Sequence, residues 1–95
     1  GDSIIGNKAH LGAGVICSNL RLDQKPVKVY NESRKSLDTG IRKLGAIIGD
    51  HVEIGCNAVL NPGSLLLPKS VVHPGHVFSG TLGNKLVAYN NPQRQ

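Results

Sequence analysis

Apolar residues recur at every sixth position in two stretches of the chain. The first stretch has hexads beginning at Ile5 and Leu11, and the second stretch opens at Ile48. Position one of each hexad is apolar, position two is often Gly, Asn or Ser, and position five is small or β-branched. The residues at position one are Ile5, Leu11, Cys17, Ile48, Ile54, Leu60, Leu66, Val72 and Phe78.

A short strand followed by a bend in every hexad explains this pattern, because position one then points into a narrow interior. We interpret the turn residues at position two, such as Gly6 and Gly12, as giving the backbone freedom for the bend. An amphipathic helix is excluded, since a period of about 3.6 residues would not keep glycine at a fixed offset. Three hexads make one coil of about eighteen residues, and stacked coils pair their strands in parallel.

The pattern therefore predicts an all-β fold, a single-stranded parallel β-helix of about three to four coils. We expect the β-helix domain to span residues 1–82, with Phe78 closing its open end, and a C-terminal tail to span residues 83–95.

The hexads are interrupted at about residues 20–44. The segment Val27-Lys28-Val29-Tyr30 alternates apolar and polar side chains and precedes turn-like residues, which predicts an inserted loop or hairpin. Insertions in solenoids project from one face and often border the binding surface. Most of the basic residues lie here, namely Arg21, Lys25, Lys28, Arg34, Lys35, Arg42 and Lys43.

Composition narrows the classes of function. The chain has 95 residues, which suits one domain, and a formal net charge of +5, which favours an anionic partner, a phosphate-bearing ligand first. Nucleic acid is disfavoured, because only 3% of the residues are aromatic and no recognition motif is present. Cys17 and Cys56 match no zinc or disulfide spacing, so we expect no metal site and two reduced thiols. Without a membrane-length apolar run or a signal peptide, we expect a cytoplasmic protein with no membrane partner.

The blocks GDSIIG at residues 1–6, LGAG at 11–14, SN at 18–19 and LGAIIGD at 44–50 resemble a known family. They are similar to the left-handed β-helix domain of sugar-1-phosphate nucleotidyltransferases, over about residues 1–77. The most similar type is the bifunctional UDP-N-acetylglucosamine pyrophosphorylase/glucosamine-1-phosphate N-acetyltransferase. The resemblance implies a left-handed coil, a homotrimer, and a sugar phosphate or nucleotide sugar as ligand. Acetyl-coenzyme A is the implied acetyl donor. The nucleotidyltransferase site, with its Mg²⁺, would lie in a separate N-terminal α/β domain that is absent from this sequence.

The resemblance also implies five ligand-binding residues. Asn19 matches an asparagine of the coenzyme A and sugar region, and Lys43 matches a lysine that meets the sugar phosphate. Ala13 matches a backbone contact to acetyl-coenzyme A, and Cys56 and Pro74 match small residues that touch the coenzyme.

Two positions depart from the family. His10 stands where well-known members have an asparagine, and Leu20 stands where they have a tyrosine. The family's catalytic histidine, a general base, would precede Gly1, so no catalytic residue is assigned within the chain. Acetyl transfer to an amine needs a group that takes up the proton. His10 is a weak candidate for this role, because it occupies a non-core position of its hexad, which favours a solvated surface histidine instead.

Three hypotheses follow. In the first, this segment is the trimerising C-terminal β-helix of a sugar-1-phosphate nucleotidyltransferase, a transferase that is inactive as this fragment alone, with sugar-phosphate and acetyl-coenzyme A binding as further expectations. In the second, it is a coenzyme A-dependent hexapeptide acyltransferase. In the third, it is a purely structural β-helix scaffold. Whether the segment itself is an enzyme stays open at the level of sequence.

Overall fold

The computed structural model describes residues 1–89, and its regular elements are all strands. Most of them are two residues long, as expected for one short strand per hexad. The strands are β1 (Ile4–Ile5), β2 (His10–Leu11), β3 (Ile16–Cys17), β4 (Lys28–Tyr30), β5 (Ser36–Asp38), β6 (Ile47–Ile48), β7 (Glu53–Ile54), β8 (Val59–Leu60), β9 (Leu65–Leu66), β10 (Val71–Val72), β11 (Val77–Phe78), β12 (Thr81–Leu82) and β13 (Val87–Ala88).

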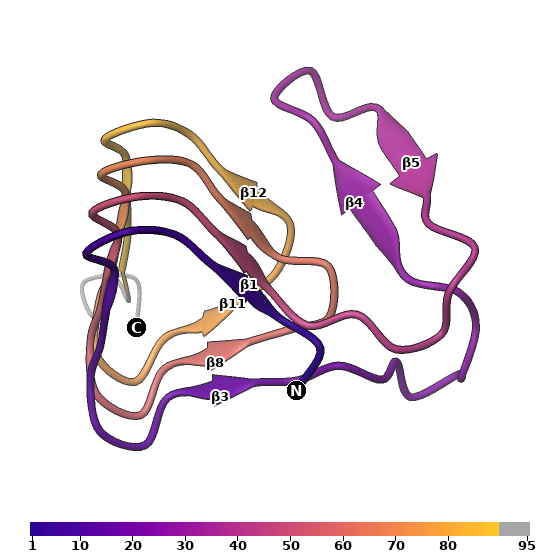
Figure 1. Cartoon of the computed structure of the whole chain (residues 1–95), viewed down its shortest axis with the longest axis horizontal. Coiled ribbons are helices and arrows are strands. Elements are labelled where there is room, and N and C mark those ends of the chain that lie inside the picture. Colours follow the sequence, from indigo (N-terminus) through magenta and orange to yellow (C-terminus); the bar gives the residue numbers. More distant parts are fainter. Residues whose placement is uncertain (90–95) are drawn as a thin grey trace, which may run out of the picture.

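The short strands stack into three parallel sheets, which form the three sides of the coil seen in Figure 1. One side has the order β1-β6-β9-β12, the second β2-β7-β10-β13 and the third β3-β8-β11. Ile48 pairs with Leu66 and Ile54 pairs with Val72, an offset of eighteen residues in each case. The predicted all-β fold, a β-helix of about four coils with an insertion, is confirmed.

The insertion is a hairpin. Strands β4 and β5 pair antiparallel, with Val29 opposite Leu37, and they project beside the β1-β6-β9-β12 side of the coil. An antiparallel bridge between Leu20 and Lys43 joins the two ends of the insertion. The coil thus continues directly across it, and Ile5 pairs with Ile48.

The last coil is shorter than the others. Leu66 pairs with Leu82 and Val72 with Ala88, offsets of sixteen residues, and the shortened corner contains Gly80 at a φ of 93°. Strand pairing therefore continues past residue 82, where we placed the domain boundary, as far as β13. Residues 90–95 of the predicted tail lie outside the described residues.

The core is narrow and mainly aliphatic, with Phe78 as an aromatic member in the described chain. Position one is buried throughout the middle coils, from Ile48 at 2% exposure to Leu60 and Leu66 at 0%. Position five is buried as well, at Val52, Ala58, Ser64 and Ser70. In the first coil, by contrast, Ile5 is 53% exposed, because within the described residues its strand pairs only with that of Ile48.

The glycines at position two of the hexads have a different role from the one that we predicted from the sequence. The residue with positive φ is at position four, where non-glycine residues take values between 55° and 63° at Lys8, His51, Asn57, Lys69 and Lys85. The glycines at position two have no positive φ, so the interpretation that they free the backbone for the bend is wrong. They are required because a Cβ there would collide with the backbone of the next coil. At Gly12 it would lie 2.7 Å from the nitrogen of Cys56.

Candidate functional site

One corner of the coil brings together three of the five predicted ligand-binding residues. Ala13, Cys56 and Pro74 occupy position three of the hexads that follow β2, β7 and β10. The carbonyl of Ala13 accepts a hydrogen bond from the amide of Asn57 at 2.9 Å, and the carbonyl of Cys56 accepts one from Gly75 at 2.9 Å. The three side chains therefore line one exposed edge, one coil above the next.

A shallow groove of about 310 Å³ runs beside this edge, and its lining is mainly apolar. Gly12 and Gly55 keep the groove open, since neither carries a side chain and the next coil approaches both of them closely. A hydrophobic chain with few polar groups fits such a lining. The groove is lined by His10, Gly12, Glu53, Ile54, Gly55, Cys56, Val71, Val72, His73 and Pro74.

An imidazole and a carboxylate meet at the rim of the groove. His10 Nδ1 lies 3.4 Å from Glu53 Oε2, and both side chains are largely exposed, at 70% and 64%. When Nδ1–H faces Glu53, Nε2 carries the lone pair and can accept a proton. Sequence reasoning missed Glu53. Both residues are at position six of their hexads and lie opposite each other on paired strands, but the insertion between them hides from the sequence that these two hexads stack.

Asn19 and Lys43 lie at a different corner from the groove. The Asn19 carbonyl accepts a hydrogen bond from the Leu44 amide at 3.0 Å, and its side-chain Nδ2 donates to Asp2 Oδ2 at 2.7 Å. Lys43 pairs with Leu20 at the base of the insertion. The structure thus divides the predicted residues into two groups: Cys56 and Pro74 line the groove, and Lys43 lines a separate depression.

Lys43 lines an open depression of about 420 Å³ together with Leu20, Gln24 and Arg42. Two cationic side chains at one depression favour an anionic group by Coulomb attraction. This is the position at which the resemblance implies a sugar phosphate.

We next consider metal ligands, thiols and membrane-spanning helices among the described residues. Residues 1–89 contain no cluster of three or more His, Cys, Asp or Glu side chains placed to hold a metal ion. Cys17 is half-buried and Cys56 exposed, and both thiols are free. Within the same residues, no helix has the length and apolar character needed to cross a membrane.

The hexad period and the three stacked parallel sheets place this chain in the class of hexapeptide-repeat β-helix proteins. No protein-family model matches the chain. Individual proteins do match. The chain is 42% identical over 83 residues to the bifunctional sugar-1-phosphate nucleotidylyltransferase/acetyltransferase of Sulfurisphaera tokodaii, covering 87% of this chain and 20% of that protein. It is 46% identical over 63 residues to the bifunctional protein GlmU of Methanocaldococcus jannaschii, covering 66% of this chain and 15% of that protein.

A third relative is a putative uncharacterized acetyltransferase, YaiX of Escherichia coli, 38% identical over 73 residues, which cover 77% of this chain and 31% of that protein. The chain is therefore homologous to the C-terminal, acetyltransferase region of the bifunctional sugar-1-phosphate nucleotidyltransferases and GlmU proteins. It spans between about a seventh and a third of the length of these relatives.

Proposed function

We propose that this chain is the β-helix unit of a sugar-1-phosphate nucleotidyltransferase/acetyltransferase, and that it binds acetyl-coenzyme A along the corner of Ala13, Cys56 and Pro74. The stacking of these three residues beside an apolar groove carries the proposal. The pantetheine arm of the coenzyme is long, thin and only sparsely polar, which suits a shallow groove with this lining. The name of the relative from Sulfurisphaera tokodaii, a bifunctional sugar-1-phosphate nucleotidylyltransferase/acetyltransferase, supports it.

The sugar phosphate, in this proposal, binds at the corner of Asn19 and Lys43. The side chains of Arg42 and Lys43 supply positive charge, and the Asn19 carboxamide is held by Asp2. Because this corner and the groove are apart within one chain, we propose that they are completed between subunits of a homotrimer.

The outer faces of the coil support this assembly. Ile16 and Val77, which both pair with Val59, are 56% and 61% exposed and form an apolar column on the β3-β8-β11 side. A second column begins at Ile4, which is 62% exposed, and continues through Ile47 on the β1-β6-β9-β12 side. Two apolar sides on each subunit suit a closed ring in which one side of a subunit packs on a different side of its neighbour.

The exposed thiol of Cys56 gives a direct test of the groove. Acetyl-coenzyme A should slow the alkylation of Cys56 by iodoacetamide while leaving the half-buried Cys17 unaffected, which serves as the internal control. Calorimetric titration of the same sample should show saturable heat at millimolar acetyl-coenzyme A. Unchanged alkylation of Cys56 together with an absence of heat would exclude the proposal and favour a purely structural β-helix. A monomer in sedimentation equilibrium at high concentration would exclude the shared site.

A second candidate, a coenzyme A-dependent acyltransferase that is active without an upstream base, is favoured by the contact between His10 and Glu53. The amine of an acceptor would attack the thioester carbonyl of acetyl-coenzyme A, and His10 Nε2 would take up the amine proton. The C–S bond would then break, and the coenzyme would leave as its thiol after taking that proton from His10. Acetyl transfer to a glucosamine phosphate by the chain alone, abolished in His10→Ala, would establish it. Binding of acetyl-coenzyme A without turnover would be consistent with the first proposal and would exclude this one.

The expectation of a cytoplasmic protein stays a prediction.

A further inference from the structure

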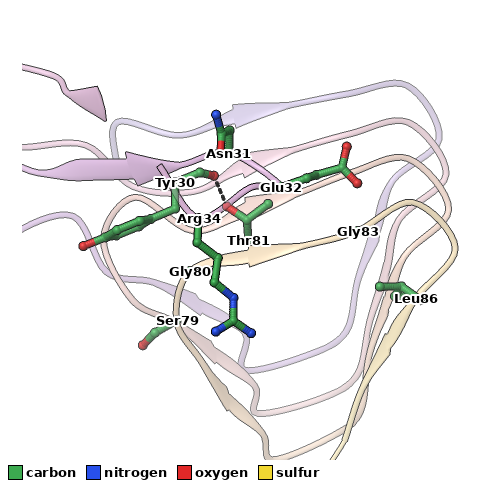
Figure 2. Close-up of a pocket in the computed structure, with 9 residues that line it drawn as sticks. All are labelled: Tyr30, Asn31, Glu32, Arg34, Ser79, Gly80, Thr81, Gly83 and Leu86. Carbon is green, nitrogen blue, oxygen red and sulfur yellow. Dashed lines mark hydrogen bonds between the residues drawn. The ribbon is translucent and has the colours of Figure 1, made fainter. Parts of the chain in front are cut away.

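The tip of the hairpin and the last coil enclose a cavity of about 490 Å³. It shares no lining residue with the groove at the Cys56 corner. Figure 2 shows the residues that line it, which come from the hairpin and from the last described coil. The lining residues are Tyr30, Asn31, Glu32, Arg34, Ser79, Gly80, Thr81, Gly83 and Leu86.

The two walls are held against each other by defined contacts. The Thr81 hydroxyl donates a hydrogen bond to the carbonyl of Tyr30, drawn as a dashed line in Figure 2. At the base of the hairpin, Val27 is completely buried, and a Cβ on Gly63 would lie 2.8 Å from Val27 Cγ1. The hairpin therefore packs closely on the coil at its base and is bonded to it near its tip.

Two opposite charges line this cavity without neutralising each other. Within residues 1–89, neither Arg34 nor Glu32 has an ion-pair partner. Figure 2 shows the two side chains pointing in different directions, Arg34 past Gly80 and Glu32 toward Gly83. Glu32 Oε2 lies 3.6 Å from the place where a Gly83 Cβ would be. A guanidinium without a carboxylate partner is suited to binding an external oxyanion.

Backbone amides of the last described coil add hydrogen-bond donors. On this side, the amides of each coil donate to carbonyls of the next, as Leu65 does to Gly80 and Leu67 to Leu82. The corresponding amides of Thr81 and Gly83 have no acceptor in the described part of the chain. Unpaired strand-edge amides favour an acceptor-rich ligand.

The backbone of Arg34 is constrained by the turn. Its amide donates to the Asn31 carbonyl at 3.0 Å, and the residue takes a φ of 63°, a conformation that glycine adopts more readily than an L-amino acid with a side chain. A glycine at this position would keep the turn and remove the guanidinium, which makes the role of the side chain separable from that of the fold.

We propose that this cavity binds a small anionic molecule. Its phosphate or carboxylate group contacts Arg34 and the donors at the edge of β12, and its hydroxyl or amine groups donate to Glu32. A volume of about 490 Å³ lies within the range of small-ligand pockets, roughly 300 to 1,000 Å³. The site is separate from the proposed acetyl-transfer groove, so either one can fail without the other.

Inorganic phosphate and acetate, titrated into the ¹⁵N-labelled full chain at constant ionic strength, test the proposal. Both probes should shift the amide resonances of Gly80, Thr81 and Gly83 in a saturable way, and their relative affinities tell which oxyanion the site prefers. Arg34→Gly should weaken phosphate binding by about tenfold or more, the loss of one charge-assisted contact. Lys35→Gln removes the same charge from the neighbouring residue, which does not line the cavity, and should change the affinity less than about twofold by screening of exposed charges.

Glu32→Gln removes the negative charge from the cavity and should strengthen phosphate binding, because like charges repel. The proposal is overturned if shifts spread over the basic residues of the whole insertion instead of the β12 edge. It is overturned equally if Arg34→Gly and Lys35→Gln weaken binding to the same extent, or if no saturable shift occurs.

Discussion

His10 and Glu53 lie side by side on paired strands, with Nδ1 of the imidazole 3.4 Å from Oε2 of the carboxylate. The two residues are separated by the whole hairpin insertion in sequence, and the hexad register brings them together. This contact bears on the tautomer of His10, because a carboxylate at Nδ1 determines which nitrogen of a neutral imidazole carries the proton.

We predict that neutral His10 carries its proton on Nδ1, from which the N–H group points at the carboxylate of Glu53. Long-range ¹H–¹⁵N spectra of the neutral imidazole report this tautomer directly. Glu53→Ala should shift His10 toward the form protonated on Nε2, while the exposed His51 of another hexad stays unchanged. An unaltered His10 spectrum in Glu53→Ala would show that the contact does not set the tautomer.

Gly55→Ala should destabilise the β-helix by about 3 kcal/mol, because the added Cβ would lie 2.5 Å from the nitrogen of Pro74 and 2.6 Å from its ring. Gly75→Ala is the matched control. Gly75 has open space around it but a φ of 71°, so alanine there should cost only about 1 to 2 kcal/mol. Urea unfolding of both variants measures the difference, and equal losses would contradict close coil approach as the reason for glycine at position two.

Ser70→Ala should stabilise the chain by about 1 kcal/mol. Ser70 is completely buried, and its hydroxyl has no hydrogen-bond partner in the described structure, so folding removes it from water without compensation. Ser64→Ala should have the opposite sign and a similar size, because the Ser64 hydroxyl donates to the Asn61 carbonyl at 2.6 Å. Thermal unfolding of the two single variants decides the question, and a loss of stability in Ser70→Ala would mean that its hydroxyl is satisfied in solution.

The first turn of the insertion should depend on pH through Asp23. The Lys25 amide donates to this carboxylate at 3.1 Å and the Arg21 guanidinium at 2.6 Å, and these two contacts lower the pKa of Asp23. Since the folded pKa lies below that of the unfolded chain, which is about 3.9, the stabilisation is fully present above that pH. It is lost as the pH falls through the lower, folded value. The Lys25 amide shift should follow this titration, and Asp23→Asn should abolish it.

Much of this molecule could be predicted from the order of its residues. The strand in each hexad, the apolar interior at position one and the small buried residues at position five all follow from a period of six that repeats in both stretches. The hairpin could be located because Val27-Lys28-Val29-Tyr30 breaks that period with an alternating pattern. Such features depend on residues close together in sequence. Because every hexad repeats the same pattern, the prediction rests on many independent examples along the chain.

Only the tertiary structure decided which residues from different coils meet. The hairpin insertion conceals the vertical alignment, so Glu53 was not recognised beside His10, and the two-residue shortening at Gly80 was not visible as a continuation of the coil. The clash that requires glycine at position two is between neighbouring coils, and the cavity at Arg34 forms where the hairpin packs on the last coil. These features depend on contacts between residues far apart in sequence, which a repeating local pattern does not encode.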